Sequence, residues 1–206
     1  MSFYLFGASG HGKVIAEIAE VNDLSITAFI DFDQSKTSIL GYKVLHEIPS
    51  HPVDITVSIG NNTIRKKIVD EHPHLNYKTL IHPNSFYSKR SQIGEGSVVM
   101  AGVSINSDSI IGKHCIINTN ASIDHDGIIE DFVHISPNAA LAGNVTVGEG
   151  THIGIGACVI QGVTIGKWCT IGAGTVIIKD VPDHSVIVGN PGRIIKTVPS
   201  QPLAEK

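Results

Sequence analysis

The chain has few charged and few aromatic residues, and it has no long apolar run. Charged side chains make up 17% of the 206 residues, aromatic side chains make up 5%, and the formal net charge is −4. This charge balance is unsuited to a general nucleic-acid partner or to an anionic membrane surface. No apolar stretch approaches the length of about 20 residues that a membrane-spanning helix needs. We therefore expect neither nucleic-acid binding nor membrane insertion.

Only three cysteines are present, and their spacing fits neither a disulfide framework nor a zinc site. Sparse, unpaired cysteine is typical of proteins in a reducing compartment. The apolar start of the chain at residues 3–6 is too short for a secretory signal. These observations favour a cytoplasmic protein without a structural metal.

The dominant positive feature is a repeat of six residues that runs unbroken from Ile81 to Val181. Its lead position is Ile, Val or Leu in sixteen of seventeen hexads, with Tyr87 as the exception, and the position four further on is usually small or β-branched. Glycine often follows the lead residue, as at Gly94 and Gly148, where we expect it to supply the backbone freedom of a corner. A period of six fits neither a helix nor an alternating strand. It predicts a parallel β-helix of hexapeptide repeats, in which residues eighteen apart stack about 4.8 Å apart.

The first eighty residues follow another pattern. Short apolar runs at residues 3–6, 27–30, 54–59 and 77–80 predict strands, and helical patterns follow the first glycine-rich turn and span residues 63–71. Alternation of strand and helix is typical of a small parallel sheet of Rossmann type. The predicted organisation is thus a Rossmann-like domain over residues 1–80, followed over residues 81–206 by a β-helix with a C-terminal cap.

Two strand ends in the predicted sheet are candidates for a nucleotide site. The turn GASGHG contains Ser9, Gly10 and His11 at a helix N-terminus, where free N–H groups attract phosphate. Asp31 ends the second strand about twenty residues later, where an acid often meets a ribose. The turn that begins at Gly60, with Arg65 one helical turn on, predicts a second anion-binding corner. The alternative is that both glycine turns only let helices pack closely on strands.

The β-helix carries the residues suited to chemistry, which the sequence suggests lie in one cluster: Asn118, His125, Asp126, His134 and His152. An aspartate beside a histidine raises the basicity of the imidazole, as a general base near neutral pH requires. His134 and His152 are eighteen residues apart and therefore stack on adjacent coils. An exposed corner position is the alternative reading for each histidine. Because a convex edge has no pocket of its own, we expect a cleft between two packed subunits.

These motifs together resemble a known family. GASGHG, FID, IGNN-x-x-R, the His125 and His134 pattern, and the ending VGNPGR resemble the left-handed β-helix acyltransferases, specifically the bacterial UDP-4-amino-sugar (bacillosamine-type) N-acetyltransferases and the related sialic acid O-acetyltransferases. The likeness runs from Tyr4 to Ile195. It departs at Asp31-Phe32-Asp33, where the bacillosamine-type enzymes carry two acids in succession.

The resemblance implies an acetyl-CoA-dependent N-acetyltransferase of bacterial glycan biosynthesis, acting on the 4-amino group of a UDP-linked amino-deoxysugar. It also implies a homotrimer with active sites between adjacent subunits, with acetyl-CoA as co-substrate and no metal. The roles it implies are His125 as general base with Asp126 in support, acetyl-CoA contacts at His134, Gly143, Ile155 and Ala173, and sugar-nucleotide contacts at Ser9, Gly10, His11, Asp31, Gly60 and Asn118. We expect an N–H of Gly143 to hold the oxyanion.

Three alternatives stay open at this point. A sugar O-acetyltransferase of the sialic acid type would share the fold, the donor and the base. A γ-carbonic-anhydrase-like enzyme would gather three of the histidines His114, His125, His134 and His152 around zinc. A non-catalytic β-helix scaffold would need none of them.

Overall fold

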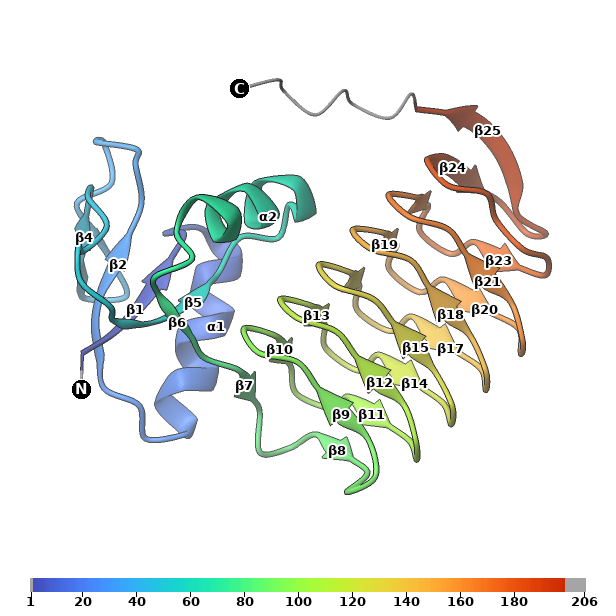
Figure 1. Ribbon diagram of the computed structural model, residues 1–206, viewed down its shortest axis with the longest axis horizontal. Coiled ribbons are helices and arrows are strands. Elements are labelled where there is room, and N and C mark those ends of the chain that lie inside the picture. The colour runs from blue at the N-terminus through green and yellow to red at the C-terminus, as the bar shows by residue number, and fades with distance from the viewer. Residues whose placement is uncertain (1, 199–206) are drawn as a thin grey trace.

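The computed structural model describes residues 2–198, and its two parts are a small helix-bearing sheet and a triangular prism of stacked coils (Figure 1). The sheet has the order β3-β4-β2-β1-β5-β6 and is parallel except for the β3–β4 hairpin. Its elements are β1 (Phe3–Phe6), α1 (Gly10–Val21), β2 (Ile26–Ile30), β3 (Ser38–Ile39), β4 (Tyr42–Leu45), β5 (Asp54–Val57), α2 (Asn62–Glu71) and β6 (Asn76–Tyr77). The predicted Rossmann-like arrangement is confirmed, whereas the short hairpin β3–β4 was not predicted.

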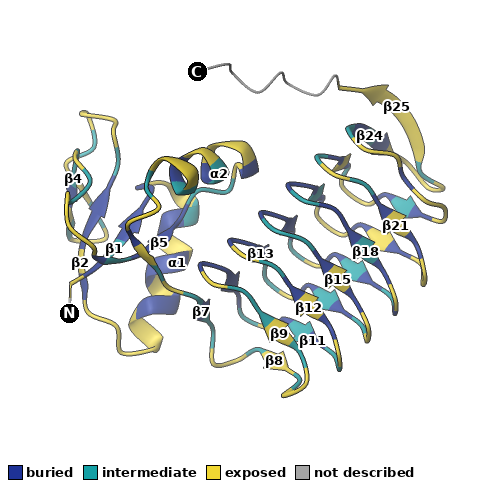
Figure 2. Ribbon diagram, viewed as in Figure 1, coloured by how far each residue is buried: buried dark blue, intermediate teal, exposed yellow. Residues whose placement is uncertain are grey.

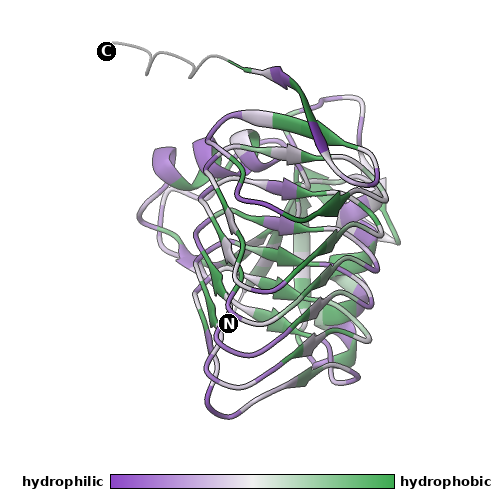
Figure 3. Ribbon diagram, turned by 90° about the vertical axis from the view of Figure 1, so that its right-hand side faces the viewer, coloured by the Kyte–Doolittle hydropathy of each residue, from purple (hydrophilic) through white to green (hydrophobic). Residues whose placement is uncertain are grey.

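The prism consists of two-residue strands that recur every six residues and form three parallel sheets. The strands are β7 (Leu80–Ile81), β8 (Phe86–Tyr87), β9 (Gln92–Ile93), β10 (Val98–Val99), β11 (Ser104–Ile105), β12 (Ile110–Ile111), β13 (Ile116–Ile117), β14 (Ser122–Ile123), β15 (Ile128–Ile129), β16 (His134–Ile135), β17 (Ala140–Leu141), β18 (Thr146–Val147), β19 (His152–Ile153), β20 (Cys158–Val159), β21 (Thr164–Ile165), β22 (Thr170–Ile171) and β23 (Val176–Ile177). Hydrophobic segments therefore recur coil after coil (Figure 3).

The lead residues of the repeat fill the bore of the prism, as predicted. Ile117 pairs with Ile135 and Ile135 pairs with Ile153, so residues eighteen apart stack directly. All three are 0% exposed and belong to one continuous core. Tyr87 lies in the first coil and is 46% exposed. The last full coil is followed by an antiparallel pair, β24 (Ser185–Val188) and β25 (Arg193–Thr197).

The glycines after the lead residues have a different role from the predicted one. Gly94 and Gly148 do not have positive φ. A Cβ on Gly94 would lie 2.6 Å from the backbone of Gly112 on the next coil, and one on Gly148 would lie 2.7 Å from Gly166. These glycines therefore permit close stacking of coils. Left-handed φ values occur instead two residues further on, at every sixth residue.

The two parts of the chain share a hydrophobic core. Helix α1 lies between the sheet and the prism (Figure 1), and its buried Ile15 and Ile18 join Leu80, Val98 and Ile116 of the prism in one cluster. Figure 2 shows both buried and exposed segments along α1, and Ile15 and Ile18 are among its buried residues. One outer face of the prism, formed by β7, β10, β13 and β16, is thus partly covered by the sheet and its helices.

Candidate active site

His125 lies in the turn between β14 and β15, at an exposed edge of the prism. Its Nδ1 lies 2.7 Å from Oδ2 of Asp126, and the two side chains are 55% and 53% exposed. A carboxylate that accepts the Nδ1–H leaves Nε2 as the proton acceptor, which is the tautomer a general base needs. The predicted pair is therefore formed within a single chain.

The backbone of Asp126 explains how the pair forms. Asp126 has φ of 58° and occupies one of the left-handed positions of the coil, which Asn and Asp tolerate better than most residues. Its N–H donates to the carbonyl of Ser107 on the preceding coil at 3.1 Å. The coil geometry itself thus turns the Asp126 carboxylate toward the neighbouring imidazole.

Gly143 lies directly beside the imidazole, one coil further on. A Cβ at this position would lie 2.5 Å from both Cε1 and Nε2 of His125, so only glycine leaves the ring where it is. Within residues 2–198, the N–H of Gly143 has no hydrogen-bond acceptor. Among the described residues its N–H is therefore unused, and an unused donor is what an oxyanion-binding role requires.

The charges around His125 favour its protonated form. The hydrogen bond that the imidazole donates to Asp126 raises the pKa of His125 above its ordinary value, and the negative charge of Asp124 raises it further. Asp124 precedes the base and is itself held in its ionised form, because hydrogen bonds from the side chain of Asn106 and the backbone of His125 lower its pKa. An imidazole of raised basicity is a stronger proton acceptor at neutral pH.

His134 and His152 form a second group, on the prism face that meets the N-terminal part. Their rings are stacked with centroids 4.7 Å apart, and the ring of His11 lies 6.3 Å from that of His134. Asn118 Nδ2 lies 3.1 Å from Nε2 of His134, and the carbonyl oxygen of Gly60 lies 3.3 Å from Nδ1. Within one chain, His125 therefore does not join this group, because it lies on an edge of the prism away from the face that carries His134 and His152.

The environment of His134 excludes it as a proton carrier near neutral pH. Burial is the main cause that lowers its pKa to about 3, and the nearby His152 and Arg65 lower it in the same direction. Its contacts fit a neutral ring that donates from Nδ1 to the carbonyl of Gly60 and accepts at Nε2 from Asn118. Oγ of Ser136 lies 2.7 Å from Nε2 of His152, a hydrogen bond that the sequence pattern did not indicate.

The positions predicted to meet acetyl-CoA lie on a third set of turns. Ile155 follows β19 and Ala173 follows β22, eighteen residues apart on one edge, and both are exposed. Asn118 lies on the same edge, whereas His125 and Gly143 lie on the edge beyond the next sheet. One chain by itself therefore does not bring the predicted donor residues to the base.

The first glycine-rich turn leaves part of its backbone donors open, because no acceptor is found within residues 2–198 for the N–H of Ser9, Gly10 or His11. Ser9 is the N-cap of α1 but its side chain makes no capping bond, and a Cβ on Gly10 would meet nothing within 4 Å. His11 is partly buried, and its Nε2 has no partner in the described part of the chain. Such a helix end is suited to a phosphate group.

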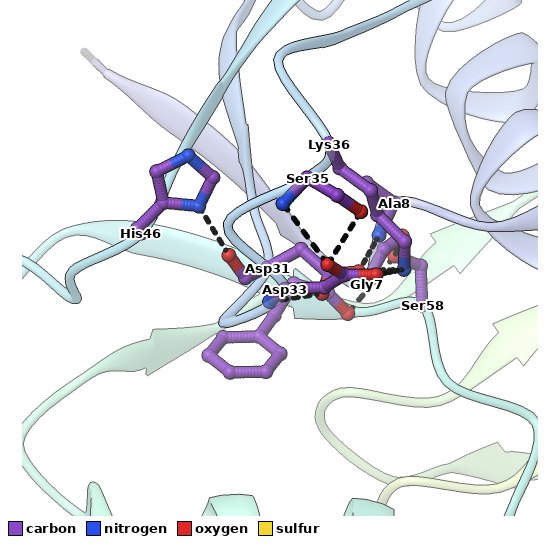
Figure 4. A network of polar contacts seen from close by, with 9 residues as sticks. Gly7, Ala8, Asp31, Asp33, Ser35, Lys36, His46 and Ser58 are labelled. Atoms are coloured by element: carbon purple, nitrogen blue, oxygen red, sulfur yellow. Dashed lines mark hydrogen bonds and ion pairs between the residues drawn. The ribbon is translucent and has the colours of Figure 1, made fainter.

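Asp31 ties the second strand to this turn (Figure 4). Its Oδ2 accepts from the N–H of Ala8 at 2.9 Å and from Nζ of Lys36 at 2.7 Å, and its Oδ1 accepts from the N–H of Asp33 at 3.0 Å. Lys36, which no motif indicated, thus already neutralises the carboxylate. Asp31 follows the end of β2, and its carboxylate holds the glycine-rich turn in place through the N–H of Ala8.

Arg65 does not form the second anion-binding corner that the sequence suggested. It is 1% exposed and clamps the two parts together. Nε donates to the carbonyl of His114 and Nη2 to that of Phe132, both at 2.8 Å, while Nη1 donates to Ile59 at 3.0 Å. The remaining contact of Nη2 is Oδ1 of Asn62 at 2.8 Å. All of its donors are used by the protein, so none is left for an anion.

No three of the four histidines in the carbonic-anhydrase alternative meet at one point in the described chain. His114 is stacked on Phe132 with centroids 5.1 Å apart, His134 and His152 lie on β16 and β19, and His125 lies on the exposed edge. Within residues 2–198, no group of three or more His, Cys, Asp or Glu side chains is placed to hold a metal ion. In the same range, no helix has the length and apolarity to cross a membrane.

Known proteins match both the N-terminal sheet and the hexapeptide prism of this chain. The profile of the PglD N-terminal domain matches residues 2–72, and that of bacterial transferase hexapeptide repeats matches residues 90–125 and 144–179. A mutant of perosamine N-acetyltransferase from Caulobacter crescentus, solved with CoA and GDP-perosamine, is 35% identical over 95% of this chain and 97% of that chain, with a TM-score of 0.89. The chain belongs to this family of left-handed β-helix acetyltransferases.

Two further relatives support membership of this acetyltransferase family. The acetyltransferase domain of PglB from Neisseria gonorrhoeae, in complex with acetyl coenzyme A, is 38% identical over 94% of this chain and 98% of that chain, with a TM-score of 0.87. UDP-N-acetylbacillosamine N-acetyltransferase of Bacillus subtilis is 40% identical over 108 residues, which cover 47% of this chain and 50% of the relative. The match thus spans about half the length of that curated relative.

Proposed function

We propose that this chain transfers the acetyl group of acetyl-CoA to the 4-amino group of a UDP-linked amino-deoxysugar in bacterial glycan biosynthesis. The observation that carries the proposal is the pair of His125 and Asp126 on an exposed edge, with the backbone of Gly143 packed against the imidazole. Base, supporting acid and oxyanion donor are the groups that acyl transfer to an amine requires. Of the relatives named above, one is a UDP-N-acetylbacillosamine N-acetyltransferase and another is a perosamine N-acetyltransferase solved with GDP-perosamine.

The reaction is a direct transfer between two bound substrates. The amine nitrogen attacks the thioester carbonyl, Nε2 of His125 takes the proton that the nitrogen loses, and Asp126 stabilises the imidazolium that results. The N–H of Gly143 donates to the carbonyl oxygen as it becomes negative. Collapse of the tetrahedral intermediate re-forms the carbonyl, and coenzyme A departs as the thiolate.

The nucleotide part of the acceptor binds at the first turn of α1. The open backbone donors of Gly10 and His11, with Ser9 as an unused cap, support a diphosphate at this helix end. Asp31 holds the turn and faces the sugar side of the nucleotide, and Gly60 with Asn118 completes the acceptor region near His134.

The proposed assembly is a homotrimer with an active site between adjacent subunits. His125 lies on one prism edge, and Ile155 and Ala173 lie on another, with the sheet of β14, β17 and β20 between them. A neighbouring copy that packs against this face brings its donor edge to the base. Acetyl-CoA and nucleotide sugars are cytoplasmic metabolites, so we place the enzyme in the cytoplasm.

The test is a thiol-release assay with acetyl-CoA and a panel of acceptors. The panel contains UDP-4-amino-4,6-dideoxy-N-acetylglucosamine, its galacto epimer, a GDP-linked 4-amino sugar and free sialic acid. CoA release with a UDP-linked amino sugar, lost in His125→Ala, supports the proposal. Release with sialic acid alone reassigns the enzyme to O-acetylation, and release with the GDP-linked sugar alone reassigns the nucleotide. The absence of release with every acceptor refutes the proposed substrate class.

A further inference from the structure

The turn that presents His125 is held by a side chain outside the predicted pair. Oδ1 of Asp124 accepts a hydrogen bond from the backbone N–H of His125 at 2.8 Å. The same oxygen accepts from Nδ2 of Asn106 at 2.8 Å. One carboxylate oxygen therefore links the backbone of the base to the preceding coil.

The coil repeat explains why this bridge is rigid. Asn106 stands eighteen residues before Asp124, so the two residues occupy the same place on successive coils. The backbone N–H of Asn106 donates to Ile123 at 2.9 Å, and that of Asp124 donates to Leu141 at 3.0 Å. The backbones of both residues are therefore fixed by inter-coil hydrogen bonds, and the Asn106 amide lies directly beside the Asp124 carboxylate.

A second set of contacts closes the turn from within. The hydroxyl of Ser109 donates to the carbonyl of Asp124 at 2.7 Å and accepts from the N–H of Gly127 at 3.2 Å. The carbonyl of His125 accepts from the N–H of Asn144 on the following coil at 2.9 Å. Neighbouring coils on both sides therefore fix the backbone at the base, and the carboxylate of Asp124 is aligned with it.

The two acids that flank the base do different things. Asp126 contacts the imidazole directly at Nδ1, whereas Asp124 contacts the backbone N–H of His125 and the side chain of Asn106. Asp124 and Asn106 also line a shallow groove of about 350 Å³ beside the edge, together with Ser122, Ala140, Ala142 and Cys158. Asp124 therefore lies next to the base and also lines this groove.

We propose that Asp124 and Asn106 are positioning residues for the general base. Asp124 holds the backbone of His125 and places a second negative charge near the imidazole, and Asn106 keeps that carboxylate turned toward the base. This inference rests on the proposed function, in which His125 takes the proton from the acceptor amine. Proton uptake by the base is then supported by two acids, one through contact and one through charge and position.

The test separates charge from shape at Asp124. Asp124→Asn keeps the shape and removes the charge, while Asp124→Glu keeps the charge in a longer side chain. We expect kcat/KM to fall roughly three- to tenfold in Asp124→Asn, with the acid limb of its pH profile moved to lower pH. In Asp124→Glu we expect a loss of kcat with the acid limb close to that of the wild type.

Asn106→Ala removes the anchor and retains both acids, so we expect a lower kcat with a small change in the pH profile. Asp131→Asn is the matched control, because Asp131 accepts from the backbone N–H of Lys113 on the preceding coil at 2.7 Å but lies on another edge. We expect it to leave kcat/KM and the pH profile unchanged.

A direct titration makes the outcome independent of turnover. The ring protons of His125, assigned by their loss in His125→Ala, are followed by NMR from pH 5 to 9 in the wild type, Asp124→Asn and Asp131→Asn. A lower midpoint for His125 in Asp124→Asn alone supports the inference. An unchanged midpoint overturns it, even if the acetyl transfer assay succeeds. If no acceptor is acetylated, the proposed function fails while the titration still decides whether Asp124 acts on His125.

Discussion

The molecule uses histidine in two opposite ways, on an exposed edge of the prism and at the junction between its two parts. On the edge, His125 is 55% exposed, contacts the carboxylate of Asp126, and has a raised pKa. At the junction, burial lowers the pKa of His11 and His114 to about 4 and that of His134 to about 3. The same side chain therefore has raised basicity in one place and is a neutral packing group in the other.

The comparison shows which physical term decides the role. Exposure leaves only a small desolvation cost for the imidazolium, so a neighbouring carboxylate can raise the pKa of His125. At the junction, desolvation dominates, and the nearby guanidinium of Arg65 opposes a further positive charge. Local charge and burial, more than residue type, separate the candidate catalytic histidine from the structural ones.

The largest expected effect is the loss of kcat when the exposed histidine, His125, is removed. We expect His125→Ala to lower kcat by about 10²–10⁴, which is the usual contribution of a positioned general base, with the thermal midpoint unchanged because the side chain is exposed. Steady-state acetyl transfer and thermal melts measure the two quantities. The control is His51→Ala, an exposed histidine far along the chain from the site. A variant that keeps most of its activity would reject His125 as the base.

The next effect concerns Arg65, which joins the two parts of the chain beside the buried histidines. We expect Arg65→Met to lower the free energy of unfolding by about 2–4 kcal/mol, because the carbonyls of His114 and Phe132 lose their buried donors. Urea unfolding of the variant and of Lys67→Met, whose side chain is 72% exposed, gives the comparison. Equal midpoints for the two variants would contradict the clamp.

A smaller loss is expected when the ring of the base is displaced. An added methyl in Gly143→Ala would meet the His125 imidazole at 2.5 Å, so we expect kcat to fall roughly 10- to 100-fold without loss of the fold. Gln161→Ala, one coil further on in the same column, is the control. If the alanine variant is as active as the wild type, the ring does not need its observed position.

The smallest expected effect is on the pH dependence of thermal stability, to which the buried His114 contributes. A histidine held neutral by burial takes up its proton more readily in the unfolded chain, so stability decreases as pH falls from about 6.5 toward the lowered pKa near 4. We expect His114→Phe to lose less thermal stability than the wild type between pH 7 and pH 5. His51→Phe serves as the exposed control. An equal loss in all three proteins would remove His114 from the group that senses pH.

Much of the prism could be predicted from its period, because each hexad repeats the same local constraints. The bore positions of Ile117, Ile135 and Ile153 followed from spacing alone. The meaning of the glycines did not, since Gly94 and Gly148 are required by contacts with the next coil, which no local pattern reveals. The short strands β3 and β4 were missed for a related reason: their pairing, not their composition, makes them strands.

The candidate site divides in the same way. The pairing of His125 with Asp126 was predicted because the two are adjacent in sequence, and the structure forms it. Within one chain, Asn118 and His134 do not join this pair, because His134 lies in a strand of another face and Asn118 lies in the turn that follows that face. Arg65 looked like an anion ligand because its spacing from a glycine turn is suggestive, but burial commits all of its donors to the protein.

The sequence by itself determined the β-helix, the Rossmann-like sheet before it and the acid–base pair, because all three depend on periodicity or on neighbours in the chain. Only the tertiary structure decided which histidines are exposed, which are buried at the junction, and which edge each predicted residue occupies. Those properties depend on how coils stack and on what packs against their faces. Burial and charge at that level set the pKa of each imidazole, and with it the chemistry each can perform.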